Sequence, residues 1–87
     1  MRYSAAVEHR VTLYSRDPCG LCDAARDAIE EARRRRPFSF EEILIDGDEE
    51  LEATYGLRVP VVLVDGEEAF EIELTAGQLL DRLGSEV

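Results

Sequence analysis

The chain has 87 residues, of which 45% are hydrophobic and 34% are charged. A chain of this length builds one small core, so we expect a single domain over residues 1–87, with its core in about residues 11–83. The formal net charge of -10 opposes binding of the whole domain to nucleic acid or to an anionic membrane.

The first predicted element is a strand over residues 11–14, which are β-branched, apolar or aromatic and lead into a Ser-Arg-Asp-Pro turn. The apolar period then lengthens to that of an amphipathic helix, which runs from residue 21 to about residue 36 and is ended by Pro37. Residues 33–36 are all arginine. We interpret them as cations favoured at the C-terminal end of a helix, the alternative being a docking patch for an acidic partner.

Residues 38–45 have the apolar and aromatic content of a second strand. Because a helix precedes it, a right-handed crossover should place it parallel to the first strand. Asp46 and Asp48 are suited to capping a short second helix. We expect this helix to pass through residues 51–53 and to end at Gly56 in the left-handed conformation common for a glycine at that position.

Residues 60–64 form an almost continuous apolar run, which predicts a buried strand. Asp65-Gly66 is a strong hairpin signal, and we expect the next strand over residues 69–73. Thr75 and Gln78 match a capping box at the start of a last amphipathic helix. The predicted order is therefore βαβαββα, an α/β class.

Cys19 and Cys22 form a C-x-x-C motif where the first strand turns into the helix. No apolar run has the length of a signal peptide or a membrane span, so we expect a cytoplasmic protein. We also expect a monomer. In the cytoplasm disulfides are usually transient and catalytic, so the pair indicates redox or metal chemistry. A closed zinc site needs four ligands, and beyond the cysteines the chain offers His9, which we expect to be an ordinary surface residue.

The two sulfur atoms should differ in reactivity. Cys19 lies at the helix N-terminus, where unpaired backbone N–H groups and the helix dipole favour a thiolate. Cys22 lies one turn later on the buried face. We therefore predict that Cys19 is the nucleophile and that Cys22 resolves the mixed disulfide. Among the neighbours, Arg16 favours the Cys19 thiolate, whereas Asp17 and Asp23 oppose it.

Over about residues 11–83 the chain resembles the thioredoxin-fold superfamily, most closely its small glutaredoxin-like proteins. The resemblance rests on DPCGLC at residues 17–22 after a strand, and on YGLRVP at residues 55–60 before an apolar strand. It implies a thioredoxin-like (glutaredoxin-like) three-layer sandwich with a four-stranded mixed sheet. It also implies that the Val59–Pro60 peptide bond is cis and that Val59 offers its N–H and C=O to substrate.

The resemblance implies a thiol-disulfide oxidoreductase that reduces protein disulfides or glutathione mixed disulfides without a bound cofactor. Its electrons would come from glutathione or a flavoprotein reductase, and Arg58 and Arg16 are candidates for binding a carboxylate of glutathione. The chain has no tryptophan before Cys19, which argues against a thioredoxin reductase as partner. It also has Glu71 and Glu73 where glutaredoxins have small residues, and these carboxylates would repel glutathione unless they point away.

A second hypothesis stays open beside the enzyme. The chain would be a non-catalytic binding module of the same fold, with Cys19 and Cys22 used for metal at a dimer or partner interface, or simply for packing.

Overall fold

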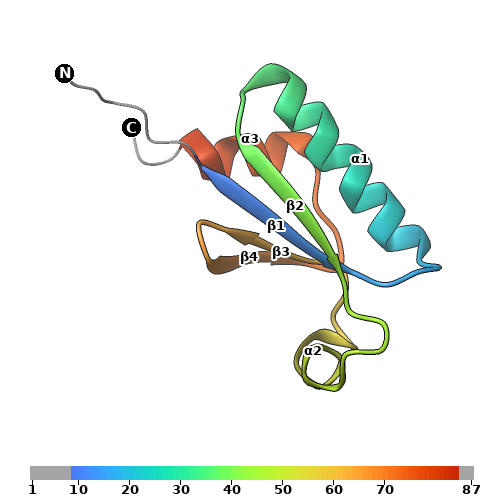
Figure 1. Cartoon of the computed structure of the whole chain (residues 1–87). Helices are drawn as coiled ribbons and strands as arrows, with labels where there is room; N and C mark the ends of the chain where they lie inside the picture. The colour runs from blue at the N-terminus through green and yellow to red at the C-terminus, as the bar shows by residue number, and fades with distance from the viewer. Residues whose placement is uncertain (1–8, 85–87) are drawn as a thin grey trace.

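The computed structural model describes residues 9–84. The elements in chain order are β1 (Arg10–Ser15), α1 (Gly20–Arg35), β2 (Ser39–Leu44), α2 (Glu49–Tyr55), β3 (Val61–Val64), β4 (Glu67–Glu71) and α3 (Ala76–Gly84). This is the βαβαββα order predicted from the sequence (Figure 1). Within residues 9–84 no helix combines the length and the apolar character needed to cross a membrane.

The four strands form one mixed sheet in the order β2-β1-β3-β4. β1 pairs in parallel with β2, and the intervening helix α1 makes the connection that a parallel pair requires. The pairs β1–β3 and β3–β4 are antiparallel. The two central strands are therefore the apolar ones, and β2 and β4 are the outer strands of this sheet.

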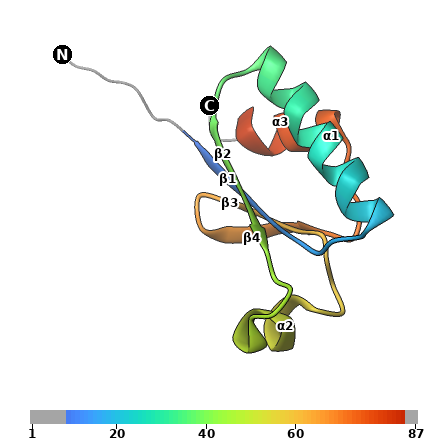
Figure 2. The ribbon, with the colours of Figure 1, turned by 45° about the vertical axis from the view of Figure 1, so that its right-hand side comes forward.

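Helices α1 and α3 lie together on one face of the sheet (Figures 1 and 2). Their apolar stripes and the inward side chains of the central strands form the core, which contains Val11, Leu13, Ala25, Ile29, Ala32, Phe38, Val62, Val64, Ala76, Leu79 and Leu83. Each large side chain buried here stabilises the fold by about 1.5–3 kcal/mol relative to its exposed state. The core thus fixes the start of α1 against the end of β1.

The opposite face is covered much less. α2 is the helix on that side, at one end of the sheet, and it has no buried residue (Figure 2). It is attached through Tyr55, whose ring stacks on Tyr14 of β1 with the centroids 4.3 Å apart and the planes at 16°. The third layer expected from the sequence is therefore reduced to a single short helix.

The start of α2 matches only one of the two predicted caps. Asp48 is the N-cap, and its carboxylate accepts the backbone N–H of Leu51 at 3.1 Å. Asp46 does not cap the helix. Its carboxylate instead accepts the backbone N–H of Asp17 at 2.9 Å, which ties the loop before the cysteines to the loop after β2.

The left-handed conformation expected at Gly56 is wrong. Gly56 has φ -54° and ψ -35°, which is right-handed helical geometry. The chain continues after α2 in a further tight turn, in which the N–H of Arg58 donates to the C=O of Tyr55 at 2.8 Å. Because the chain does not reverse at residue 56, no left-handed residue is needed there.

The hairpin after β3 forms as predicted, but β4 is shifted. Asp65 and Gly66 both have positive φ, 54° and 87°, as a two-residue hairpin turn requires. Val64 then pairs directly with Glu67, so β4 begins two residues before the predicted residue 69. It ends early because Ile72 has φ 73° and turns the chain away from the sheet.

Two helix ends follow the sequence prediction. Thr75 and Gln78 form the capping box of α3, with the Gln78 N–H on Thr75 Oγ1 at 3.1 Å and the Thr75 N–H on Gln78 Oε1 at 2.9 Å. The arginine run closes α1, where Arg33 and Arg35 pair with Glu30 and Glu31 of the same helix at 3.5 and 3.0 Å. Arg33 also lies 5.7 Å from the ring centroid of Phe40 in β2, so Arg33 and Arg35 both have partners within the protein.

Candidate active site

The cysteine pair lies at the N-terminus of α1. Cys19 is the N-cap residue, with extended backbone, and it is partly exposed. Cys22 lies in the first turn, on the face toward the sheet, and is 0% exposed. The two Cα atoms are 5.2 Å apart and the sulfur atoms are paired as a disulfide, a Cα separation within the usual range for such a bond.

Backbone groups of the first helical turn surround Cys19. The N–H of Cys22 donates to Cys19 Sγ at 3.1 Å, and the N–H of Asp23 donates to the C=O of Cys19 at 3.0 Å. An N–H donor and the positive end of the helix dipole both stabilise negative charge on a sulfur atom at this position. The sulfur of Cys22, in contrast to that of the partly exposed Cys19, is enclosed by the core and does not contact water. The two sulfur atoms are therefore chemically distinct.

A second segment of the predicted site precedes β3. The Val59–Pro60 peptide bond is cis, and Pro60 is buried. The C=O of Pro60 accepts the N–H of Ile72 at 2.8 Å, which joins this segment to the end of β4. Among the hydrogen bonds of residues 9–84, none uses the backbone N–H or C=O of Val59. The Asp17–Pro18 bond before the first cysteine is also cis.

Arg58 binds groups of the protein itself. Its guanidinium donates to Glu68 at 2.8 Å, to Glu71 at 3.1 Å and to the C=O of Thr54 at 3.1 Å, and it lies 5.4 Å from the ring centroid of Tyr55. The hydrogen bond from Arg58 holds the pKa of the Glu68 carboxyl below its ordinary value. Of the two carboxylates expected to oppose glutathione, Glu71 is therefore paired.

Arg16 likewise binds the end of α2. Its Nη2 donates to the C=O of Gly56 at 3.3 Å, and its guanidinium lies 3.7 Å from carboxylate oxygens of Asp46 and Glu52. Cations are favoured at a helix C-terminus, where carbonyl groups lack partners. Arg16 and Arg58 together thus hold α2, a helix that has little apolar contact of its own.

A polar cluster that the sequence analysis did not identify lies beneath the first half of α1. Arg26 donates to both carboxylate oxygens of Glu42 at 2.8 and 2.6 Å, and to Asp23 at 2.9 Å. The fully buried Ser15 donates its hydroxyl to Glu42 at 2.6 Å. The hydrogen bond from Arg26 is the main cause that lowers the pKa of Glu42.

The contact between Glu42 and Arg26 depends on the register of the parallel strands β1 and β2. Glu42 is the partner of Leu13, whose side chain faces α1, so Glu42 also faces α1. Arg26 lies one turn after Cys22 on the same side of the helix. The sequence predicts the parallel pair but not its register, and the register decides which carboxylate meets the arginine.

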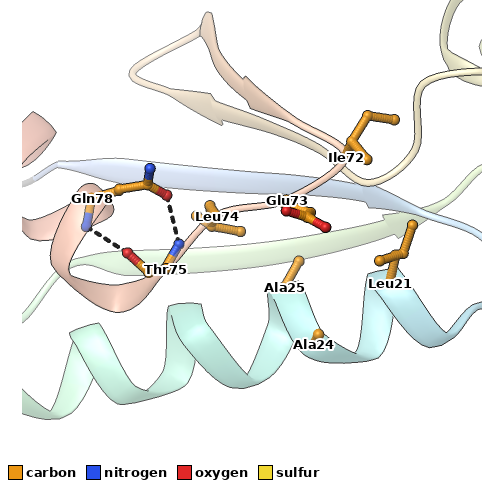
Figure 3. A pocket seen from close by; sticks show the side chains of 8 residues that line it. All are labelled: Leu21, Ala24, Ala25, Ile72, Glu73, Leu74, Thr75 and Gln78. Atoms are coloured by element: carbon orange, nitrogen blue, oxygen red, sulfur yellow. Dashed lines mark hydrogen bonds between the residues drawn. The ribbon is translucent and has the colours of Figure 1, made fainter.

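A cleft opens beside the cysteine motif, between α1 and the segment that joins β4 to α3 (Figure 3). Its volume is about 370 Å³. The lining residues are Leu21, Ala24, Ala25, Ile72, Glu73, Leu74, Thr75 and Gln78. The cleft could not be predicted from the sequence, because its two walls are about fifty positions apart in the chain.

The expectation that His9 is a surface residue is wrong. His9 is 5% exposed, and its Nδ1 lies 2.7 Å from Asp65 Oδ2. The antiparallel pairing of β1 with β3 brings the hairpin turn to the start of β1, where the N–H of Arg10 also donates to Asp65. This backbone donor, followed by His9, lowers the pKa of Asp65. Within residues 9–84 no three His, Cys, Asp or Glu side chains are grouped so as to hold a metal ion.

Comparison with known proteins gives one family and several similar structures. A family model described as "Glutaredoxin-like domain (DUF836)" matches residues 10–84. The X-ray structure of protein XcR50 from X. campestris, a structural genomics target, is 41% identical, has a TM-score of 0.75 and is matched over 86% of this chain and 96% of that chain. None of the curated proteins searched matches the sequence significantly.

Two further structures extend this similarity. Protein Ne2328 from Nitrosomonas europaea is 25% identical with a TM-score of 0.75, over 90% of this chain and 94% of that chain. A mutant thioredoxin from Halobacterium salinarum NRC-1 is 24% identical with a TM-score of 0.67, over 90% of this chain and 74% of that chain. At that identity the thioredoxin supports the fold alone.

Proposed function

This chain belongs to the glutaredoxin-like family DUF836, and we propose that it is a thiol-disulfide oxidoreductase in which Cys19 and Cys22 alternate between a dithiol and a disulfide. The observation that carries the proposal is the pairing of the two sulfur atoms at the start of α1, with the N–H of Cys22 directed at Cys19 Sγ. A thioredoxin-like fold that has such a pair is suited to redox chemistry.

The reaction starts with the Cys19 thiolate. It attacks one sulfur of the substrate disulfide, forms a mixed disulfide with it and expels the other sulfur as a thiolate. The Cys22 thiolate then attacks Cys19 Sγ, which forms the Cys19–Cys22 disulfide and releases the second substrate thiolate. The substrate gains two electrons and, after protonation, two thiol hydrogens, and the cysteine pair loses the same two electrons. A thiol reductant of the cell, glutathione or a reductase, restores the dithiol.

The substrate meets the protein at the Val59–Pro60 segment in this proposal. The N–H and C=O of Val59 are unused within residues 9–84, so they are available to an extended backbone. Towards a glutathione mixed disulfide, Arg58 and Arg16 would contribute by exchanging their present carboxylate partners for a carboxylate of glutathione. We place the reaction in the cytoplasm, with no bound cofactor.

The test is a redox titration in glutathione buffers, in which thiols are trapped by alkylation and each species is identified by intact mass. Wild type should interconvert between dithiol and Cys19–Cys22 disulfide, with a midpoint between roughly -120 and -270 mV. Cys19→Ser should abolish reduction of disulfides, whereas Cys22→Ser should accumulate a mixed disulfide on Cys19. Thiols that stay reduced throughout, or that bound zinc protects from alkylation, would contradict the proposal. A mixed disulfide that forms on Cys22 instead would reverse the two roles.

A further inference from the structure

The cleft of Figure 3 adjoins the residues that would hold a substrate. Leu21, in one wall, is two residues from Cys19, so their Cα atoms are separated by at most about 7 Å. Ile72, at the other wall, donates its N–H to the C=O of Pro60 at 2.8 Å. In an extended substrate, a residue one or two positions from the reacting cysteine lies about 4–7 Å from it. Its side chain therefore has the reach to enter the cleft.

The walls of the cleft present apolar surface to water. Leu21 is 47% exposed and Ile72 is 36% exposed, so neither side chain is used by the core of the fold. The φ of 73° at Ile72 is unfavourable for a β-branched residue, and it turns the chain out of β4 at this position. An apolar substrate side chain would remove these surfaces from water, which favours binding.

The charge at the cleft is negative, because the nearby cations Arg16 and Arg58 are already paired with carboxylates of the protein itself. Glu73 lines it, and within residues 9–84 no cation pairs with the Glu73 carboxylate. Asp17 and Asp23 are exposed on either side of the cysteine motif, and Asp23 shares the cation of Arg26. The formal net charge of the whole chain, these carboxylates included, is -10. A cationic ligand is attracted to this field, and glutathione, which is a net anion, is repelled by it.

We propose that the preferred substrate is a polypeptide disulfide in which an apolar residue and a cation follow the reacting cysteine, and that it is preferred over glutathione disulfide. The apolar side chain occupies the cleft between Leu21 and Ile72, and the cation pairs with Glu73. This inference rests on the function proposed above and assigns a substrate class to the same cysteine pair.

The experiment compares kcat/KM for four disulfides. Two are disulfide-linked peptides with leucine after the cysteine, followed by arginine in one and glutamate in the other. The others are glutathione disulfide and the uncharged 2-hydroxyethyl disulfide. Wild type should favour the arginine peptide over the glutamate peptide by about tenfold at low salt, and this ratio should fall as salt is added.

Two variants with matched controls test the two contacts. Glu73→Lys should lower the ratio between the arginine and glutamate peptides by at least about tenfold, to one or below, because it replaces attraction of the arginine by repulsion. Glu41→Lys makes the same change of charge on β2, outside the cleft, and should leave the ratio unchanged. Leu21→Ala should weaken selection of leucine over serine in the peptide by about threefold. Leu44→Ala, a similarly exposed leucine on β2, is its control.

The outcomes separate the inference from the proposed function. Equal kcat/KM for the two charged peptides, equal effects of Glu73→Lys and Glu41→Lys, or a preference for glutathione disulfide would overturn the substrate class while leaving the oxidoreductase in place. If even 2-hydroxyethyl disulfide is not reduced, the proposed function fails and the substrate class fails with it.

Discussion

Glu42 is the residue through which three parts of the protein meet. It accepts hydrogen bonds from Arg26 of α1 and from the buried Ser15 at the end of β1. The salt bridge between Glu42 and Arg26 is bidentate and only partly exposed, with side-chain exposures of 35% for Arg26 and 23% for Glu42. Such a charge-assisted pair fixes orientation as well as distance. It therefore helps to set the position of the helix that begins at the cysteines.

Glu42→Gln should lower the free energy of unfolding by about 1 kcal/mol at pH 7. Because hydrogen bonding to Arg26 lowers the pKa of Glu42 below 4.5 in the folded protein, its contribution is present above that pH and is lost as the pH falls through the folded pKa. The difference between wild type and variant should therefore shrink below about pH 4.5. Urea unfolding of the oxidised proteins at pH 7 and at lower pH values measures it.

Glu41→Gln is the matched control, since Glu41 is the exposed neighbour on the same strand. It should cost little at either pH. A pH-independent loss in Glu42→Gln would show that the residue acts through packing and not through its charge.

At this scale the sequence predicts the cysteines and not their surroundings. Cys19 and Cys22 are found because a motif within one segment places both sulfur atoms at a helix start. Glu42 and its two partners come from three elements. The position of Glu73 in the wall of the cleft depends on a turn at Ile72, which the local sequence does not predict. Contacts between distant segments depend on strand register and turn geometry, which single residues do not specify.

Among the three helices of residues 9–84, α2 has the weakest attachment, since it has no buried residue, whereas α1 and α3 each have several. Tyr55→Leu removes its stack on Tyr14 and should lower the protection of α2 amides from hydrogen exchange by about fivefold, as expected for an aromatic pair worth about 1 kcal/mol. Exchange in α1 should be unchanged. Thr54→Ala, at the adjacent exposed position, is the control, and equal exchange in both variants would mean that the ring stack does not hold the helix.

The capping box of α3 gives a second prediction at this scale. Thr75→Ala removes the acceptor of the Gln78 N–H and should lower the free energy of unfolding by about 1 kcal/mol. Thr75→Ser keeps the hydroxyl and should retain most of the stability. Thermal or urea unfolding checks both, and equal losses in the two variants would point to the lost methyl group rather than to the cap.

The order of the elements could be predicted because the hydrophobic periodicity of each helix or strand lies within its own segment. The ends of the elements could be predicted only where the capping residues are also close together in the sequence. Thr75 and Gln78 are three positions apart, and their bonds form as expected. The residue type of Gly56 alone predicts a left-handed conformation, which the structure does not have. Its actual backbone follows from the next turn and from Arg16 and Arg58, which come from other parts of the chain.

For the whole molecule, the dominant long-range interaction is electrostatic repulsion, because the chain has 20 acidic and only 10 basic residues. Self-repulsion of this charge opposes the compact state, and salt screens it over about 10 Å at 0.1 M. We therefore expect Tm to rise by about 3–6 °C between low salt and 0.5 M salt. Calorimetry in KCl measures this. A fall in Tm would mean that the ion pairs around Arg26 and Arg58 outweigh the general repulsion.

The outer strands have a consequence for the behaviour of many copies together. β2 carries the exposed Glu41 beside Glu42, which is paired with Arg26. β4 carries Glu67, Glu68 and Glu71, three carboxylates that share the two cations Arg58 and Arg82. Two molecules that met strand to strand, as in the first step of fibril growth, would bring these rows of carboxylates together. The carboxylates on the outer strands β2 and β4 therefore oppose aggregation by electrostatic repulsion. This repulsion is lost when the carboxylates are protonated. We therefore expect the protein to form insoluble assemblies in acidic solution before it does so at neutral pH.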